Sequence, residues 1–222
     1  MEHIVRILDI AQVTHNVKAF RVEKPDNYVF EPGQATEVSI NQQSWEDEKR
    51  PFTFTSLNEE HFLEFTIKGY FDHNGVTQKL HSLVPGDELI LRDIWGAIAY
   101  KGEGTFIAGG AGITPFISIL RQLYKDGRLL GNQLFFANQT EDDIIYKDEL
   151  DKMLGNNVQY LLSRSSGSSR YYVGRVDADY LKSHVKDFSQ HFYVCGPDEM
   201  VKDISDLLTD LGAQPDAVVF EK

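Results

Sequence analysis

The sequence predicts two domains, an antiparallel β-barrel followed by an α/β domain with a parallel sheet. Two observations support this fold class. Up to about Tyr100, short alternating apolar runs are divided by turn residues, which is typical of an antiparallel barrel. From Thr105 onward, apolar strands alternate with helical patterns, which indicates a parallel sheet with right-handed crossovers. We therefore expect a boundary near residues 101–104, with one domain over 1–101 and the other over 102–222.

The barrel half contains four runs in which apolar and polar residues alternate with the period of a strand. Turn signals such as Pro32-Gly33-Gln34 and Pro85-Gly86-Asp87 separate these runs, because glycine supplies a positive φ angle. The predicted strands cover residues 17–22, 35–40, 62–68 and 88–91, and a short predicted helix covers 75–83.

The second half alternates between strands and helices. Its clearest helix covers 198–211, because the apolar residues form one stripe and Gly212 follows as a stop. The other predicted helices cover 115–125, 146–153 and 177–185, and the strands cover 105–108, 133–137, 158–163 and 191–195. Ligands of a parallel sheet bind at the carboxyl ends of its strands. The loops at 109–115, 138–140, 163–164 and 195–197 should therefore meet at one edge of the sheet.

Composition excludes several classes of partner and site. The net charge is −12 without a basic run, so neither nucleic acid nor an anionic membrane is an expected partner. The apolar runs are too short to span a bilayer, and residues 1–20 show no secretion signal, so we expect a cytoplasmic protein. The lone Cys195 rules out an internal disulfide, a cysteine-ligated zinc site and a cysteine-bound iron–sulfur cluster in this chain, and no metal site is expected.

The glycine turn at 109–115 is the first candidate binding site. Gly110 and Gly112 let a ligand approach the backbone, and a helix that starts beside them offers unpaired N–H groups to a phosphate. Thr114 is the predicted N-cap of this helix, and Pro115 suits its first turn. The dinucleotide fingerprint has glycine where Pro115 stands, so the turn taken alone fits a plain strand-to-helix connection equally well.

The barrel half has two further candidates. In a strand, Arg50 and Phe52 would share one face, with Thr53 on the other. Arginine forms forked hydrogen bonds to phosphate and an aromatic ring stacks on a flat heterocycle, so this face could bind both groups. The alternative is an ordinary strand with one exposed arginine. The short helix begins with Gly75, Val76 and Thr77. The free N–H groups at this helix start could bind a phosphate. The alternative is that Thr77 is simply the N-cap of the helix.

Two candidates lie at strand ends in the second half. Ser163, Arg164, Arg170 and Tyr172 flank a flexible loop and could clasp a phosphate and stack on adenine, or the arginines could simply be solvated. Asn138-Gln139 stands after the second strand where an acid would hold ribose hydroxyls, which favours NADP over NAD. Cys195 and Gly196 end the fourth strand, either as an ordinary buried cysteine or as a close approach to a ligand.

These motifs in this order resemble the ferredoxin–NADP reductase-like family of flavin-dependent oxidoreductases, nearly from end to end. The resemblance implies a flavin on the barrel and a nicotinamide dinucleotide on the α/β domain. Arg50 would hold the flavin phosphate, Phe52 would lie against the ring system, and Thr53 would lie near the reactive nitrogen. Main-chain groups that include Ile67 and Lys68 would line the flavin. Gly75, Val76 and Thr77 would take the pyrophosphate, which favours FAD over FMN.

The resemblance also assigns the dinucleotide site. Thr114 would lie between the two cofactors, beside the turn of Gly110 and Gly112. Ser163, Arg164, Arg170 and Tyr172 would form the pocket for the 2′-phosphate, so NADPH is expected as the donor, with NADH as an alternative. Cys195 and Gly196 would lie beside the nicotinamide.

The expected reaction is hydride transfer from NADPH to bound FAD, followed by electron transfer to a separate acceptor such as ferredoxin or flavodoxin. Thr53, Cys195 and Glu221 would tune the geometry and polarity of this step. The charge of −12 opposes such acidic acceptors, unless a basic patch of Arg121, Lys125 and Arg128 receives them. The alternative is a flavin-carrying subunit of a larger complex without independent NADPH turnover.

Two departures from the family pattern affect the flavin site. Phe52 lacks the hydroxyl of the family tyrosine. No aromatic residue follows Glu221, where many relatives carry a ring that covers the flavin. Either Phe220 takes a related part, or the flavin face is open to a partner.

Overall fold

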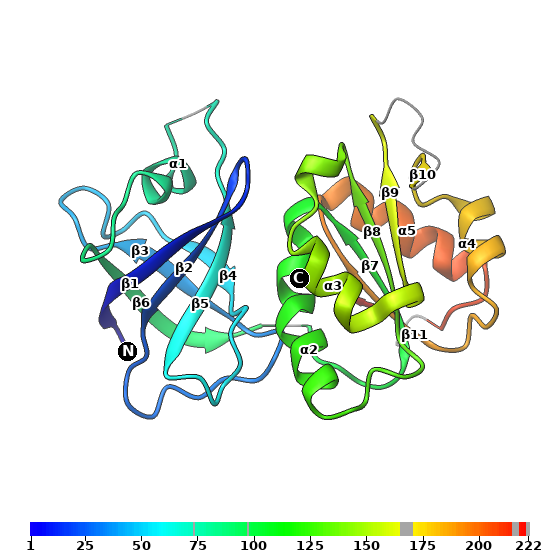
Figure 1. The fold of residues 1–222 in the computed structure, drawn as a ribbon, viewed down its shortest axis with the longest axis horizontal. Coiled ribbons are helices and arrows are strands. Elements are labelled where there is room, and N and C mark those ends of the chain that lie inside the picture. Colours follow the sequence, from blue (N-terminus) through cyan, green and yellow to red (C-terminus); the bar gives the residue numbers. More distant parts are fainter. Residues whose placement is uncertain (73, 97, 165–170, 215–217, 221–222) are drawn as a thin grey trace.

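Two six-stranded sheets lie beside each other in the computed structural model of the chain (Figure 1). The structure describes residues 1–72, 74–96, 98–164, 171–214 and 218–220. The first sheet is antiparallel and the second is parallel, so the predicted fold class is confirmed. Among the described residues, no helix is long and apolar enough to cross a bilayer.

The antiparallel sheet has the strand order β4-β3-β6-β1-β2-β5. Its strands are β1 (His3–Thr14), β2 (Val17–Glu23), β3 (Ala35–Ile40), β4 (Arg50–Thr53), β5 (Phe62–Lys68) and β6 (Glu88–Trp95), and helix α1 (Val76–His81) follows β5. The end strands β4 and β5 approach each other where a bridge joins Phe54 to Phe65. Phe54 also stacks on Phe30 with ring centroids 4.2 Å apart, so aromatic rings fill the interior between the sheet ends.

The parallel sheet has the strand order β10-β9-β8-β7-β11-β12. Its strands are β7 (Gly104–Gly109), β8 (Gln133–Asn138), β9 (Val158–Leu162), β10 (Tyr172–Val173), β11 (His191–Cys195) and β12 (Val218–Phe220). The helices are α2 (Thr114–Lys125), α3 (Lys147–Leu154), α4 (Ala178–His184) and α5 (Asp198–Asp210), with 3₁₀ turns η1 (Gly110–Ile113), η2 (Glu141–Asp143) and η3 (Gly155–Asn157).

Helices cover both faces of the parallel sheet. Phe106 of β7 packs in the core under α2 and α3, while its neighbour Ile107 packs in the core under α4 and α5. Because both faces are buried, these strands are continuous apolar runs rather than alternating ones. Helix α2 lies on the face turned toward the barrel, between the two sheets (Figure 1).

Most predicted elements occur within a few residues of their expected bounds, with two informative exceptions. Strand β1 went unpredicted because Ile4 and Leu8 point outward, 60% and 50% exposed, and blur the alternation that marks a strand. The prediction of Thr114 as a helix N-cap is wrong. The turn η1 precedes the helix, Thr114 is the first residue of α2, and its hydroxyl accepts a hydrogen bond from Thr53 instead.

Candidate functional site

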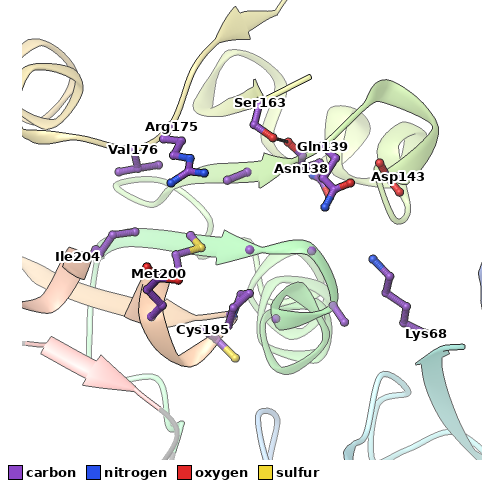
Figure 2. A pocket seen from close by; sticks show the side chains of 18 of the residues that line it. Lys68, Asn138, Gln139, Asp143, Ser163, Arg175, Val176, Cys195, Met200 and Ile204 are labelled. Atoms are coloured by element: carbon purple, nitrogen blue, oxygen red, sulfur yellow. Dashed lines mark hydrogen bonds between the residues drawn. The ribbon is translucent and has the colours of Figure 1, made fainter. Parts of the chain in front are cut away.

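A cavity of about 660 Å³ opens along the carboxyl edge of the parallel sheet (Figure 2). The ends of β7, β8 and β11, the start of α2 and the first turns of α5 line it, and Lys68 and Tyr70 reach it from the barrel. This is the edge at which ligands of parallel sheets bind, and the volume lies in the range of cofactor sites.

The glycine turn after β7 packs closely against the chain that follows β11. A Cβ on Gly112 would clash with the carbonyl oxygen of Cys195, and a Cβ on Gly109 would clash with the sulfur of Met200. Gly110 has φ +52°, a left-handed conformation, and a Cβ there would meet nothing within 4 Å. Gly109 and Gly112 therefore serve close packing against the turn after β11, while the backbone at Gly110 borders open space.

The start of α2 is suited to an anion. Ile113 is its N-cap and provides no side-chain hydrogen bond, and Pro115 lies in the first turn. The N–H of Thr114 is paired with the carbonyl oxygen of Ala111 in the preceding turn, and Pro115 has no N–H, so this end offers an anion chiefly the partial positive charge of the helix dipole. Because Gly112, Thr114 and Pro115 all line the cavity, a phosphate bound in it would meet this helix end.

Asn138, the last residue of β8, lies at the predicted ligand edge, but the sequence does not reveal the state of its side chain. Its side chain lines the cavity and is only 8% exposed, yet neither the amide nitrogen nor the amide oxygen has a hydrogen-bond partner among the described residues. An unpaired buried polar group costs free energy, and a ligand with one acceptor and one donor would pair it. The only signal in the sequence is a polar residue at the end of an apolar strand.

The charges around the cavity are mixed. Lys68 and Arg175 are the basic side chains among the described residues that line it, and Figure 2 shows both pointing toward its interior. The carboxylates of Asp143, Glu199 and Asp203 line it as well. The sequence analysis does not identify Arg175 as a site residue. The available signal is its position between a glycine and Val176, which is buried and fixes this part of the loop.

The residues predicted to hold a 2′-phosphate do not all meet. Ser163 lines the cavity, and its N–H donates to the carbonyl oxygen of Asn138 over 3.0 Å. Arg164 is exposed and does not line it, and Tyr172 packs edge-on against Tyr180 with ring centroids 4.7 Å apart. Arg170 lies outside the described residues. Among the described members of the group, only Ser163 borders the cavity.

The residues predicted to lie near the nicotinamide do come together. Cys195 and Gly196 line the cavity at the end of β11, and Cys195 is 6% exposed. Thr114 lines it from α2 and accepts a hydrogen bond from the hydroxyl of Thr53 over 2.9 Å. Strand β4 of the barrel therefore touches the cavity wall through this pair. Glu221 lies outside the described residues.

The residues predicted to hold the flavin occupy the barrel face near this contact. Arg50 is exposed, donates to the carbonyl oxygen of Lys49 over 2.6 Å and lies 3.8 Å from the carboxylate of Glu48. Phe52 is half-buried against the barrel core. An exposed guanidinium and a half-buried ring along one strand fit the phosphate and the flat ring system of a flavin.

Further along the barrel, some of the other residues predicted to contact the flavin already have hydrogen-bond partners within the protein. The carbonyl oxygen of Ile67 lies 2.9 Å from Nε2 of His81, whose pKa burial lowers. Gly75, not Thr77, is the N-cap of α1 and provides no side-chain bond, while Val76 is buried. The Thr77 hydroxyl accepts from the N–H of Tyr70 over 3.3 Å, so the N-cap alternative for Thr77 is wrong.

The three cations of the suggested basic patch do not lie on one helix, because α2 ends at Lys125 and Arg128 follows it. Arg121 forms ion pairs with Glu64 and Glu149, and its side chain is only 19% exposed. Lys125 forms an ion pair with Glu59. Arg121 is therefore turned toward the barrel and α3, whereas Lys125 pairs with Glu59 at the surface, where its side chain is 53% exposed.

Comparisons with known proteins match both halves of the chain. Residues 3–93 match the family model of an FAD-binding domain, and residues 106–206 match that of an oxidoreductase NAD-binding domain. The chain is 28% identical over 235 residues to NADH-cytochrome b5 reductase 2 of Mus musculus, which covers 88% of this chain and 85% of the relative.

Solved structures share the whole fold. A ferredoxin NADP+ reductase from Neisseria gonorrhoeae has a TM-score of 0.86 at 21% identity, over 99% of this chain and 97% of that one. The cytochrome b5 reductase domain of Ulva prolifera nitrate reductase has a TM-score of 0.85 at 21% identity, also over 99% and 97%.

Proposed function

The chain belongs to the ferredoxin–NADP reductase-like family of flavin- and nicotinamide-dependent oxidoreductases, and from this premise we propose that it oxidises NADH and reduces a separate haem protein of the cytochrome b5 type. One observation carries the proposal above all. The cavity on the parallel sheet borders the barrel through the Thr53–Thr114 hydrogen bond, so groups bound on the two domains would meet there.

The barrel residues fit an FAD. Arg50 would pair with its phosphate, Phe52 would lie against its ring system, and the start of α1 at Gly75 would receive its pyrophosphate. When bound, FAD supplies the exchange between two-electron and one-electron transfer, while the protein supplies orientation and electrostatics. Thr53 is placed to orient the region where the two cofactors meet, because its hydroxyl is fixed on Thr114.

The cavity fits the dinucleotide. The start of α2 would receive a phosphate, Lys68 would approach the same charge from the barrel, and the amide of Asn138 would pair with a polar edge of the ligand. Cys195 and Gly196 would lie beside the nicotinamide, where the close-packed turns exclude water from one side.

We propose NADH over NADPH as the donor, the reverse of the sequence-based expectation. Of the two arginines predicted to hold a 2′-phosphate, Arg164 does not line the cavity and Arg170 lies outside the described residues, while the carboxylates of Glu199 and Asp203 line it. The names of the similar curated proteins point the same way, since NADH-cytochrome b5 reductases of several animals match most of this chain.

The acceptor is proposed from the same names. Proteins named NADH-cytochrome b5 reductase match over most of their own length, which supports a b5-type haem protein over the ferredoxin or flavodoxin first expected. The cytoplasm remains the proposed location.

Steady-state reduction of purified cytochrome b5, followed by the haem absorbance, tests this function. The FAD-loaded protein should reduce the haem with NADH faster than with NADPH, and omission of FAD should abolish the reaction. Rapid reduction of ferricyanide with no reduction of cytochrome b5 would remove this acceptor and retain the NADH oxidoreductase.

A further inference from the structure

One face of α2 carries a row of polar side chains that all contact the barrel. Successive members are three or four residues apart, which places them on the same side of the helix. The row consists of Thr114, Ser118, Arg121 and Lys125. Because each member contacts a different barrel segment, α2 is fixed on the barrel along its whole length.

The first two contacts hold the half of α2 nearest the cavity. Thr114 accepts from the hydroxyl of Thr53 over 2.9 Å, and the hydroxyl of Ser118 accepts from the N–H of Gly33 over 3.1 Å. Ser118 is fully buried. A Cβ on Gly33 would clash with the carbonyl oxygen of Ile98 and lie 3.0 Å from Cδ1 of Ile119 on α2, so a glycine is required where this turn approaches the helix.

Arg121 makes the most hydrogen bonds of the row. Its Nε and Nη2 donate to the two carboxylate oxygens of Glu149 on α3, over 2.6 and 2.9 Å. Its Nη1 donates to Glu64 of β5 over 2.9 Å and to the carbonyl oxygen of Thr55 over 2.6 Å. Burial opposes the charge, but Glu149 and Glu64 outweigh it and raise the pKa of Arg121 above its usual value. A guanidinium is suited to this task because its donors are fixed in a planar fork.

Glu64 is the barrel end of this contact and is itself buried, with 3% of the residue exposed. It also accepts from Nε of Arg21 over 3.1 Å and from the hydroxyl of Thr55 over 3.1 Å. A buried carboxylate with several donors is fixed in position, and loss of one partner leaves an uncompensated charge.

Tyr146 adds a second link to the same place. Its phenol hydrogen-bonds to the hydroxyl of Thr66 on β5 over 2.9 Å and donates to Glu64 over 3.4 Å. The backbone of Tyr146 lies in the left-handed region with φ 53°, which is unfavourable for a bulky residue. The α/β domain therefore maintains a strained residue at the point where it contacts β5.

We propose that Arg121 is a positioning residue that sets the separation of the two cofactors through its pair with Glu64. Arg121 does not line the cavity, but it lies on the same rigid helix as Thr114 and the glycine turn. A slide of α2 along β5 would displace Thr114 from Thr53, and displacement by about 1 Å can cost roughly 100-fold in rate. This inference rests on the proposed function.

The test compares Arg121→Met with Lys125→Met, which removes the exposed ion pair at the end of the same row. FAD content, dinucleotide affinity and the limiting rate of anaerobic flavin reduction by NADH are measured for both. We expect Arg121→Met to lower the limiting rate roughly 10- to 100-fold while FAD content and affinity stay within about three-fold. Lys125→Met should stay within about two-fold in all three. A wild-type rate in Arg121→Met, or equal losses in both variants, would overturn the proposal.

Calorimetry of the FAD-free protein gives a readout that does not depend on turnover. The wild type and Lys125→Met should unfold in one transition, and Arg121→Met in two, because the buried ion pair between α2 and β5 is lost from the contacts that couple the two sheets. If Arg121→Met does not fold, Tyr146→Phe and Glu64→Gln replace it, with smaller effects in the same direction. If the wild type is not reduced by NADH, the proposed function fails, while a single transition in Arg121→Met separately refutes the coupling.

Discussion

The hydroxyl of Thr53 donates a hydrogen bond to the hydroxyl of Thr114 over 2.9 Å, and this bond joins the barrel to the helix that borders the cavity. Thr53 ends β4, which carries the predicted flavin contacts Arg50 and Phe52, whereas Thr114 follows the glycine turn. The two halves of the proposed reaction would therefore meet at a contact between two side chains.

Thr53→Val should slow flavin reduction by NADH without a matching loss of FAD. Valine keeps the shape but cannot donate to Thr114, so the contact between β4 and α2 is no longer specified. We expect a loss of about 1 kcal/mol in the free energy of unfolding. Anaerobic stopped-flow absorbance measures the rate. Thr209→Val, which removes a bond on the exposed side of α5, is the control and should leave the rate unchanged.

Asn138→Leu should weaken dinucleotide binding without lowering the stability of the free protein. Both amide atoms of Asn138 are buried without partners among the described residues, so their removal relieves a cost when no ligand is bound. With a ligand, the lost hydrogen bonds should raise the dissociation constant roughly 10-fold. Titration calorimetry and thermal melts measure the two effects.

Asn132→Leu is the matched control for that experiment. Asn132 is 2% exposed, but its amide oxygen accepts from the N–H of Gly104 over 3.1 Å and its nitrogen donates to the carbonyl oxygens of Arg128 and Leu129. Its substitution should lower the melting temperature markedly. If Asn138→Leu were destabilised to the same extent, its amide would have a structural role instead.

Arg175→Ala should weaken binding of NADH by about five-fold, whereas Arg164→Ala should leave it unchanged. Arg175 lines the cavity and Arg164 does not. Fluorescence titration with NADH and NADPH measures both affinities. A selective loss of NADPH binding in Arg164→Ala would restore the 2′-phosphate site predicted from the sequence.

Cys195→Ala should slow flavin reduction and leave FAD content intact, because Cys195 lines the cavity at its proposed nicotinamide end. The absorption spectrum of the purified variant gives the FAD content, and stopped-flow absorbance gives the rate. Unchanged reduction kinetics would remove Cys195 from the mechanism.

The free energy of unfolding should fall in acid as Glu64 becomes protonated. Burial opposes its ionisation, but Arg121 outweighs burial and holds the pKa of Glu64 below its usual value of 4.5. The folded protein therefore keeps this carboxylate ionised at a lower pH than the unfolded chain does. Its contribution is complete above pH 4.5 and is lost as the pH falls through the lowered value.

Urea unfolding across that range measures the effect against Glu64→Gln. The variant should be less stable at neutral pH by about 3 kcal/mol, because a buried pair is broken. It should lose less stability than the wild type as the pH falls below 4.5. Parallel decreases in the two proteins would show that other groups carry the acid dependence.

Local patterns predicted much of the fold. The stripe on α5 placed that helix within one residue of its observed end, and the glycine turn after β7 lies at the predicted edge of the sheet. Both depend on neighbours in sequence. Strand β1 was missed because its outward Ile4 and Leu8 are apolar, which no local rule anticipates.

The site was less predictable, because its decisive contacts join residues far apart in the chain. The sequence suggests Arg121 as a docking cation, but the structure pairs it with Glu64, 57 positions away. The sequence places Asn138 at the ligand edge but shows neither its unpaired amide nor the position of Arg175 at the cavity wall, since burial without a partner and position at a cavity wall are three-dimensional properties. The left-handed backbone of Tyr146 is likewise imposed by tertiary contacts.

Anaerobic mixing of the FAD-loaded protein with NADH, followed by the visible absorbance of the flavin, tests the central claim most directly. An oxidoreductase of the proposed kind should lose its flavin absorbance rapidly with NADH and more slowly with NADPH. A protein that retains FAD but keeps its full absorbance with both nucleotides would contradict the claim and support the flavin-carrying subunit instead.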